Sequence, residues 1–138
     1  MTDRDAWNKS IIEEFRANEG RVGGRFEGRL LLLLHHTGAK TGLPRLNPLA
    51  YMMDGERYVL IASKGGAPTH PDWYYNLLAH PNVTVEMGTE TFAAVAKLAS
   101  DPERTRLFDE MAARNPVFTT YKSKTTRTFP VFTLTRKS

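Results

Sequence analysis

The chain has 138 residues, of which 41% are hydrophobic and 25% charged, so it is long enough for one ordinary globular domain and is unlike a disordered chain. It contains no cysteine, which excludes disulfide frameworks, cysteine-based zinc sites and thiol catalysis. The net charge is +4, with lysine and arginine scattered along the chain. This charge favours an anionic small ligand over nucleic acid, because no nucleic-acid recognition motif accompanies it.

The sequence offers no candidate for a membrane span. Its longest aliphatic run, residues 30–34, is far shorter than the roughly 18 residues that indicate such a span. The N-terminal residues lack the basic-then-apolar order of a signal peptide. We therefore expect a cytoplasmic protein that at most touches the inner face of a membrane.

The N-terminal segment has apolar residues at helical spacing, which predicts a helix over residues 3–19 that Gly20 would end. These apolar positions are Trp7, Ile11, Ile12 and Phe15. The following residues, 20–28, are rich in glycine and arginine and predict a flexible connector. We expect one domain over residues 1–138, in which the N-terminal helix (1–19) is able to move.

Three strands are predicted next. The apolar run 29–36 is followed by turn residues and has the length of a strand. Residues 45–54 and 57–64 flank an Asp-Gly-Glu turn and predict a hairpin. Pro48 predicts an edge position or a bulge, because proline cannot donate to a ladder.

A short helix should follow the third strand. Thr69 and Asp72 have the spacing of a capping box. The helix should then run through Asn76 and Leu78 and end near His80. Its first turn contains Trp73, and the position has two interpretations: an anchor in the core, or an aromatic face for a ligand.

The last third of the chain predicts a hairpin, a helix and a strand. Residues 82–88 and 89–99 alternate apolar and polar positions around Gly88. Ser100, followed by an early proline and a glutamate, predicts the start of a helix. Residues 129–135 predict a final strand. The mostly antiparallel order with interspersed helices predicts an α+β fold in which a small β-barrel hides the sheet edges.

Two basic loops rich in glycine each follow a strand. The first, GAKTG at 38–42, lacks the spacing of a phosphate-binding P-loop. Lys40, Thr41 and Arg45 nevertheless supply donors suited to phosphate or carboxylate oxygens, and the glycines expose backbone N–H groups. The alternative for this loop is a solvated basic turn.

The second loop, residues 63–66, has the sequence SKGG. Lys64 supplies charge, Gly65 and Gly66 allow a ligand to approach the backbone, and Ser63 can donate to a ring carbonyl. Asn76 falls one helical turn after Trp73, so both side chains can face the same side of the helix. The alternative is a plain turn, but two such loops in one small domain favour an anionic ligand.

Residues 115–123 hold two aromatic side chains, Phe118 and Tyr121, three residues apart and therefore on one helical face. They predict either ordinary core packing or an aromatic wall beside a substrate. The histidines predict no metal site, because His35 and His36 point to opposite faces of a strand and no ligand motif is spaced around them.

Taken together, these motifs resemble the deazaflavin-dependent nitroreductase family, whose members are small split β-barrel proteins, related to FMN-binding barrels, that use coenzyme F420. The resemblance covers residues 20–136 and rests on four segments in a fixed order. The segments are TGAKTGLPRLNPL, DGERYVLIASKGGAPTHPDWYYNL, AHPNVTVEM and TYKSKTTRTFPVFTL.

The resemblance implies a reduced deazaflavin that carries a phosphate and an oligoglutamate tail. The residues that match the phosphate and tail side are Lys40, Thr41, Arg45, Asn47 and Pro48. The residues that match the segments around the deazaflavin are Ser63, Lys64, Gly65, Gly66, Trp73 and Asn76. Ser63 and Tyr121 are the implied donors to a substrate that accepts a hydride.

Nitroreductases of this family carry three tyrosines in the substrate wall, whereas this chain has Asn115, Phe118 and Tyr121. The resemblance therefore implies a quinone as the first choice of acceptor, and a nitroaromatic or activated enone as the second. Two other functions stay open: a carrier that binds deazaflavin without turnover, and a protein of the same fold that binds a flavin or haem. A homodimer also stays open.

Overall fold

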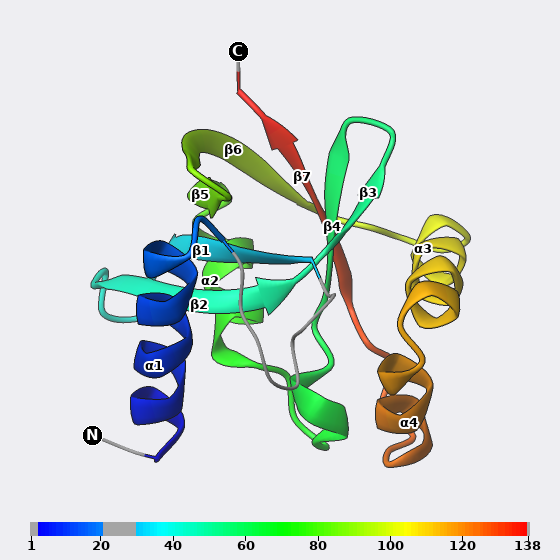
Figure 1. Ribbon diagram of the computed structural model, residues 1–138. Helices are drawn as coiled ribbons and strands as arrows, with labels where there is room; N and C mark the ends of the chain where they lie inside the picture. The colour runs from blue at the N-terminus through cyan, green and yellow to red at the C-terminus, as the bar shows by residue number, and fades with distance from the viewer. Residues whose placement is uncertain (1–2, 21–29, 138) are drawn as a thin grey trace.

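The computed structural model describes residues 3–20 and 30–137 (Figure 1). Its strands form one antiparallel sheet in the order β2-β1-β5-β6-β7-β4-β3. The strands are β1 (Leu31–Thr37), β2 (Pro44–Ala50), β3 (Met52–Asp54), β4 (Arg57–Ile61), β5 (Asn82–Met87), β6 (Glu90–Leu98) and β7 (Val131–Arg136). The helices are α1 (Asp3–Ala17), α2 (Asp72–Ala79), α3 (Glu103–Arg114) and α4 (Val117–Ser123), with a short 3₁₀ turn, η2, at Lys64–Gly66.

The two outer strands of the sheet, β2 and β3, are consecutive in the chain and are separated by Tyr51 alone. The Tyr51 N–H donates to the Leu30 carbonyl at 3.2 Å, so the chain leaves β1 there and continues beside β4. The sheet consequently curls until its two edges meet, which confirms an α+β split β-barrel. The prediction of a single strand over residues 45–54 is wrong at Tyr51, because this is where the barrel turns its corner.

Most of the predicted pairings are confirmed. Asp54 pairs with Arg57 across the first hairpin, and Met87 pairs with Glu90 across the second. Pro48 lies on β2, an outer strand of the sheet, as its missing N–H requires. The strand predicted over residues 57–64 ends early, at Ile61, because the chain turns into η2.

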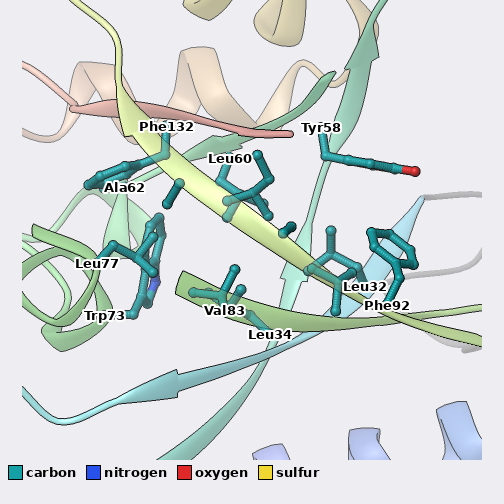
Figure 2. Close-up of a cluster of buried hydrophobic side chains, with 14 residues drawn as sticks. Leu32, Leu34, Tyr58, Leu60, Ala62, Trp73, Leu77, Val83, Phe92 and Phe132 are labelled. Carbon is teal, nitrogen blue, oxygen red and sulfur yellow. The ribbon is translucent and has the colours of Figure 1, made fainter. Parts of the chain in front are cut away.

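The barrel interior is filled by alternate residues of its strands. On β6, Phe92, Ala94 and Ala96 are buried while their neighbours are exposed. Figure 2 shows how Leu32 and Leu34 of β1 meet side chains from β4, β5, β7 and α2 in this core. Burying each large apolar side chain contributes about 1.5–3 kcal/mol relative to exposure, so this interior fixes the strand register.

Helix α1 covers the outer face of β1. Ile11 and Phe15 pack against Leu31 and Leu33, so β1 is buried on both faces. The helix ends at Ala17, two residues before its predicted end, and a turn follows it up to Gly20, whose N–H donates to the Phe15 carbonyl at 2.7 Å. The connector predicted over residues 20–28 lies outside the described residues from position 21 onward.

An ion-paired side chain fastens the C-terminal end of α1 to the barrel. Arg16 donates Nη2–H to Glu86 Oε2 at 2.6 Å and Nε–H to Glu86 Oε1 at 3.1 Å. His35 Nε2 lies 2.5 Å from Glu86 Oε2. The Arg16 hydrogen bond is the main reason that the pKa of Glu86 lies below its ordinary value.

Helices α3 and α4 lie together at the other side of the barrel (Figure 1). Leu107, Met111 and Phe118 are buried there in a second cluster with Phe129. The final strand is confirmed as β7, and the helix predicted after Ser100 is confirmed as α3.

Helices α2 and α3 begin near their predicted starts, but neither Thr69 nor Ser100 caps its helix with its side chain. Helix α2 follows Pro71 without a side-chain cap, and Thr69 Oγ1 instead accepts from Lys64 Nζ at 3.2 Å. At α3, Ser100 makes no side-chain cap. The carboxylate of Asp101 accepts from the Thr105 N–H at 3.1 Å and from the Thr105 hydroxyl at 2.7 Å. A carboxylate accepts hydrogen bonds more strongly than a serine hydroxyl, which explains why Asp101 rather than Ser100 binds Thr105.

Candidate active site

An open pocket of about 1380 Å³ lies where the two basic loops, α2, α4 and α1 face one another. Pockets for one small molecule typically measure about 300–1,000 Å³, so this pocket has room for a cofactor and a second molecule. The sequence-predicted residues that line it are Lys40, Thr41, Arg45, Asn47, Pro48, Ser63, Lys64, Gly65, Trp73, Asn76, Asn115, Phe118 and Tyr121. Gly66 is absent from the lining.

The first basic loop (38–42) uses most of its backbone donors within the protein. The Gly38 N–H donates to the Leu43 carbonyl at 2.9 Å, and the Gly42 N–H donates to the Gly38 carbonyl at 2.9 Å. The Ala39 N–H donates to Asn76 Oδ1 at 2.8 Å. The expectation of exposed backbone N–H groups is therefore wrong for these residues. The donors that face solvent here are the exposed side chains of Lys40 and Thr41.

A buried chain of polar side chains holds this loop against α2 and β2. Asn76 accepts from the loop with Oδ1 and donates from Nδ2 to His36 Nδ1 at 3.0 Å. His36 Nε2 lies 2.7 Å from Asn47 Oδ1. Because an amide oxygen only accepts, the hydrogen-bond pattern assigns the proton to Nε2 and leaves Nδ1 as the acceptor.

His36 is a member of the site that the sequence analysis did not assign. Its side chain is buried, and burial is the main cause that lowers the pKa of His36 below the ordinary 6.5. The neutral form is the one that the two asparagines require. The available signal was strand alternation, which places His36 on the same face of β1 as Leu32 and Leu34.

Trp73 lies mainly in the core of the barrel. Its indole is buried and packs against Phe132, with ring centroids 5.8 Å apart. Figure 2 places it beside Leu77 and Ala62. Trp73 thus anchors α2, which carries Asn76, while an edge of the side chain contributes to the pocket.

The second basic loop (63–66) has an unusual backbone. Lys64, Gly65 and Gly66 have φ values of 48°, 63° and 86°, so three successive residues are left-handed. This conformation costs a residue with a Cβ roughly 1–2 kcal/mol. Non-glycine residues in such conformations cluster at functional sites, where the surrounding structure holds them.

The two glycines of this loop face different surroundings. A Cβ on Gly65 would meet no atom within 4 Å, so Gly65 borders open space in the pocket. A Cβ on Gly66 would lie 2.6 Å from the Tyr121 carbonyl oxygen. Gly66 therefore allows the loop to lie directly against the backbone of α4.

Helix α4 supplies the aromatic side of the pocket. Phe118 is buried and Tyr121 is partly exposed, and their rings meet edge to face with centroids 5.7 Å apart. The shared helical face is therefore confirmed. Asn115 precedes the helix and also lines the pocket. From the opposite end of the chain, Trp7 and Ile12 of α1 contribute further apolar surface.

The lining is suited to a flat anionic group. Among its described residues, three cationic side chains (Lys40, Arg45 and Lys64) stand against one carboxylate (Asp72), a formal charge of +2. The open space beside Gly65 leaves the loop backbone accessible. Apolar side chains from β4 and α4 also line the pocket. These features fit a deazaflavin with a phosphate and an acidic tail. Among the described residues, no three histidine, aspartate or glutamate side chains are placed so that they could hold a metal ion.

Comparison with known proteins also indicates a protein that uses F420. The sequence model of the F420H(2)-dependent quinone reductase family matches residues 7–136. An F420H(2)-dependent quinone reductase from Mycobacterium tuberculosis is 43% identical over 127 residues, which cover 89% of this chain and 85% of that protein.

Two solved structures are also similar. One, described as an F420-H2 dependent reductase, is 36% identical with a TM-score of 0.69 and covers 77% of this chain and 94% of its own. The other, described as a domain-swapped dimer, is 31% identical with a TM-score of 0.71 and covers 96% of this chain and 99% of its own. The chain therefore belongs to the F420H(2)-dependent quinone reductase family.

Proposed function

We propose that this protein reduces a quinone with reduced coenzyme F420 as the hydride donor. The observation that carries the proposal is a single large pocket in which two basic loops and an aromatic helix face the same space. Membership of the quinone reductase family supports the same reaction. The physiological quinone is a flat, electron-poor molecule, with activated enones and nitroaromatics as poorer substrates.

The cofactor would be held by the two loops. Lys40, Thr41 and Arg45 would bind the phosphate and the acidic tail with charge-assisted hydrogen bonds. The deazaflavin would be bordered by Ser63, Lys64 and the open backbone at Gly65. When bound there in its reduced form, it would supply a hydride to the acceptor. The chain contributes orientation and electrostatics to this reaction and needs no nucleophile of its own.

Two hydroxyl groups would act on the acceptor. As the hydride arrives, negative charge develops on a quinone oxygen, and a hydrogen-bond donor beside that oxygen stabilises it. Ser63 and Tyr121 line the pocket and carry such donors. The proton that completes the hydroquinone comes from Tyr121 or from water that reaches the open pocket. Asn115 and Phe118 add no hydroxyl to this wall, which favours a quinone over a bulky nitroaromatic.

Turnover separates this function from that of a carrier. Purified protein is mixed with reduced F420 and menadione, and oxidation of the cofactor is followed by absorbance and fluorescence. We expect faster oxidation than without protein, and slower turnover with a nitroaromatic. Tight binding of F420 without acceleration by any quinone, enone or nitro compound would contradict the proposal and favour a carrier. Retention of FMN without affinity for F420 would favour a flavin protein of the same fold.

The assembly and location of the protein are also part of the proposal. The domain-swapped relative supports a homodimer, so we expect light scattering to give twice the chain mass of 15.6 kDa. No helix in the described parts of the chain is long and apolar enough to cross a bilayer. We place the reaction in the cytoplasm, with at most peripheral contact at the inner face of the membrane, and cell fractionation tests this placement.

A further inference from the structure

Arg127 lies in the segment between α4 and β7, outside the pocket lining, and makes four polar contacts with residues 62–70. Its Nη2–H donates to the Ser63 carbonyl at 2.7 Å, and its Nη1–H donates to the Ala62 carbonyl at 3.1 Å. Its Nε–H donates to the Ala67 carbonyl at 3.1 Å, and Nη1 lies 2.7 Å from His70 Nδ1. One guanidinium thus engages both ends of the second basic loop.

The guanidinium is itself fixed in place. It lies over the ring of Phe129 at 4.7 Å from the centroid, and Phe129 is buried in the cluster formed with α3 and α4. The carbonyl of Arg127 accepts from Lys122 Nζ of α4 at 3.1 Å, and its N–H donates to Thr125 Oγ1 at 3.1 Å. Arg127 therefore joins the loop to the same body that carries the aromatic side of the pocket.

Two further observations concern the loop that Arg127 binds. The loop contains the left-handed residues Lys64, Gly65 and Gly66, a conformation that needs outside contacts to persist at Lys64. Gly66 also abuts the backbone of Tyr121, so the loop and α4 touch directly. The carbonyls bound by Arg127 flank these left-handed residues on both sides, so the guanidinium supplies outside contacts to this conformation.

We infer that Arg127 is a positioning residue that locks the Ser63–Gly66 loop and helix α4 into one arrangement, so that the cofactor and the acceptor are held in register. This inference rests on the proposed function. Lysine cannot replace arginine here, because a single ammonium cannot reach carbonyls at both ends of the loop as the planar fork does. A displacement of about 1 Å between hydride donor and acceptor can cost roughly 100-fold in rate.

The test compares Arg127→Lys with Arg104→Lys in the full chain. Arg104 donates to the Phe129 carbonyl at 3.3 Å and makes no hydrogen bond or ion pair with loop residues 63–66, so it controls for general loss of stability. In Arg127→Lys we expect roughly tenfold weaker binding of oxidised F420, a lower kcat and faster hydrogen exchange at the amides of residues 63–67. In Arg104→Lys we expect these three quantities to match the parent at equal folded fraction.

A second variant tests the guanidinium itself. Arg127→Ala should regain part of its F420 affinity when guanidinium ion is added at a concentration that leaves the fold intact, whereas Arg104→Ala should not respond. Unchanged affinity, kcat and exchange in Arg127→Lys would overturn the inference, and so would equal effects in both lysine variants. If the parent binds no F420, the proposed function fails, and the exchange rates still decide whether Arg127 holds the loop.

Discussion

The two basic loops look alike in sequence but are held in opposite ways. The first (38–42) is mostly exposed, uses most of its backbone donors for its own turn and for Asn76, and leaves the Lys40 side chain in solvent. The second (63–66) has a strained, left-handed backbone that is pressed against α4 and gripped by Arg127. The first therefore offers exposed charge, and the second offers a surface that contacts hold in place.

This difference indicates that the two loops bind different parts of the cofactor. A flexible, multiply charged tail is bound well by long cationic side chains that adapt to it. The ring that transfers a hydride needs an exact position, which a backbone held from both sides provides. Substitutions that loosen the second loop should therefore damage the fold and the reaction more than substitutions in the first.

The largest expected effect is that of Gly66→Ala. The new methyl group would meet the Tyr121 carbonyl, and the φ of 86° disfavours any residue with a Cβ. Left-handed strain and overpacking together should lower the free energy of unfolding by about 3 kcal/mol. Urea unfolding followed by circular dichroism measures this change.

Gly65→Ala is the matched control for that substitution. Gly65 has a φ of 63° but open space around its Cα, so only the backbone strain remains. We expect a loss of about 1 kcal/mol. Equal losses in the two variants would show that the contact between Gly66 and α4 contributes nothing.

A smaller effect is expected from Asn76→Ala, which acts on the first loop. The substitution leaves the Ala39 N–H and His36 Nδ1 without the partners that the asparagine provides. A buried polar group that loses its partner costs about 1–3 kcal/mol, so we expect a loss of about 2 kcal/mol in urea unfolding. Asn82→Ala, on the exposed start of β5, is the control and should change stability by less than about 0.5 kcal/mol.

A still smaller effect should appear as a pH dependence. The pKa of His36 is lowered in the folded protein, mainly by burial, so the unfolded chain binds this proton more readily. The stability contributed by neutral His36 is therefore complete above the ordinary pKa of 6.5 and is lost as the pH falls from there through the lowered value. The charged or titratable side chains around it that are expected to modulate this loss are Arg45, His35 and Asp72.

Urea unfolding between pH 7.5 and 5 measures this dependence. His36→Gln should flatten the decline between about pH 6.5 and 5 relative to the parent. His70→Gln provides the control, because the pKa of His70 is lowered as well, by burial and by Arg127, and its share of the decline must be measured separately. An unchanged slope in His36→Gln would show that His36 is not the responsible group.

The sequence predicts those parts of the molecule that local chemistry determines. Gly55 and Gly88 mark two hairpins, and the alternation along β6 identifies its buried face, so both features follow from residues close in the chain. The break at Tyr51 does not, because residues 45–54 form one strand-like run and only closure of the barrel divides it.

The contacts that hold the two loops are also long-range. His36 bonds Asn47, which is 11 residues away in the chain, and Asn76, which is 40 residues away. The bonds from the Arg127 guanidinium to residues 62–70 span 57 to 65 residues. Sequence motifs therefore indicated the two loops and also Asn47 and Asn76, whereas His36, Arg127 and the hydrogen bonds that fix the loops emerged only from the fold.

The division of roles between the loops is tested most directly by titrating two ligands, F420 and a deazaflavin that lacks the phosphate and the acidic tail. Binding to the parent, Lys40→Ala and Lys64→Ala is measured by ligand fluorescence at low and high salt. We expect Lys40→Ala to weaken F420 binding about fivefold at low salt, less at high salt, and to leave the tailless deazaflavin unaffected. Lys64→Ala should weaken both ligands. Equal effects of Lys40→Ala on the two ligands, or no binding of F420 by the parent, would contradict the account.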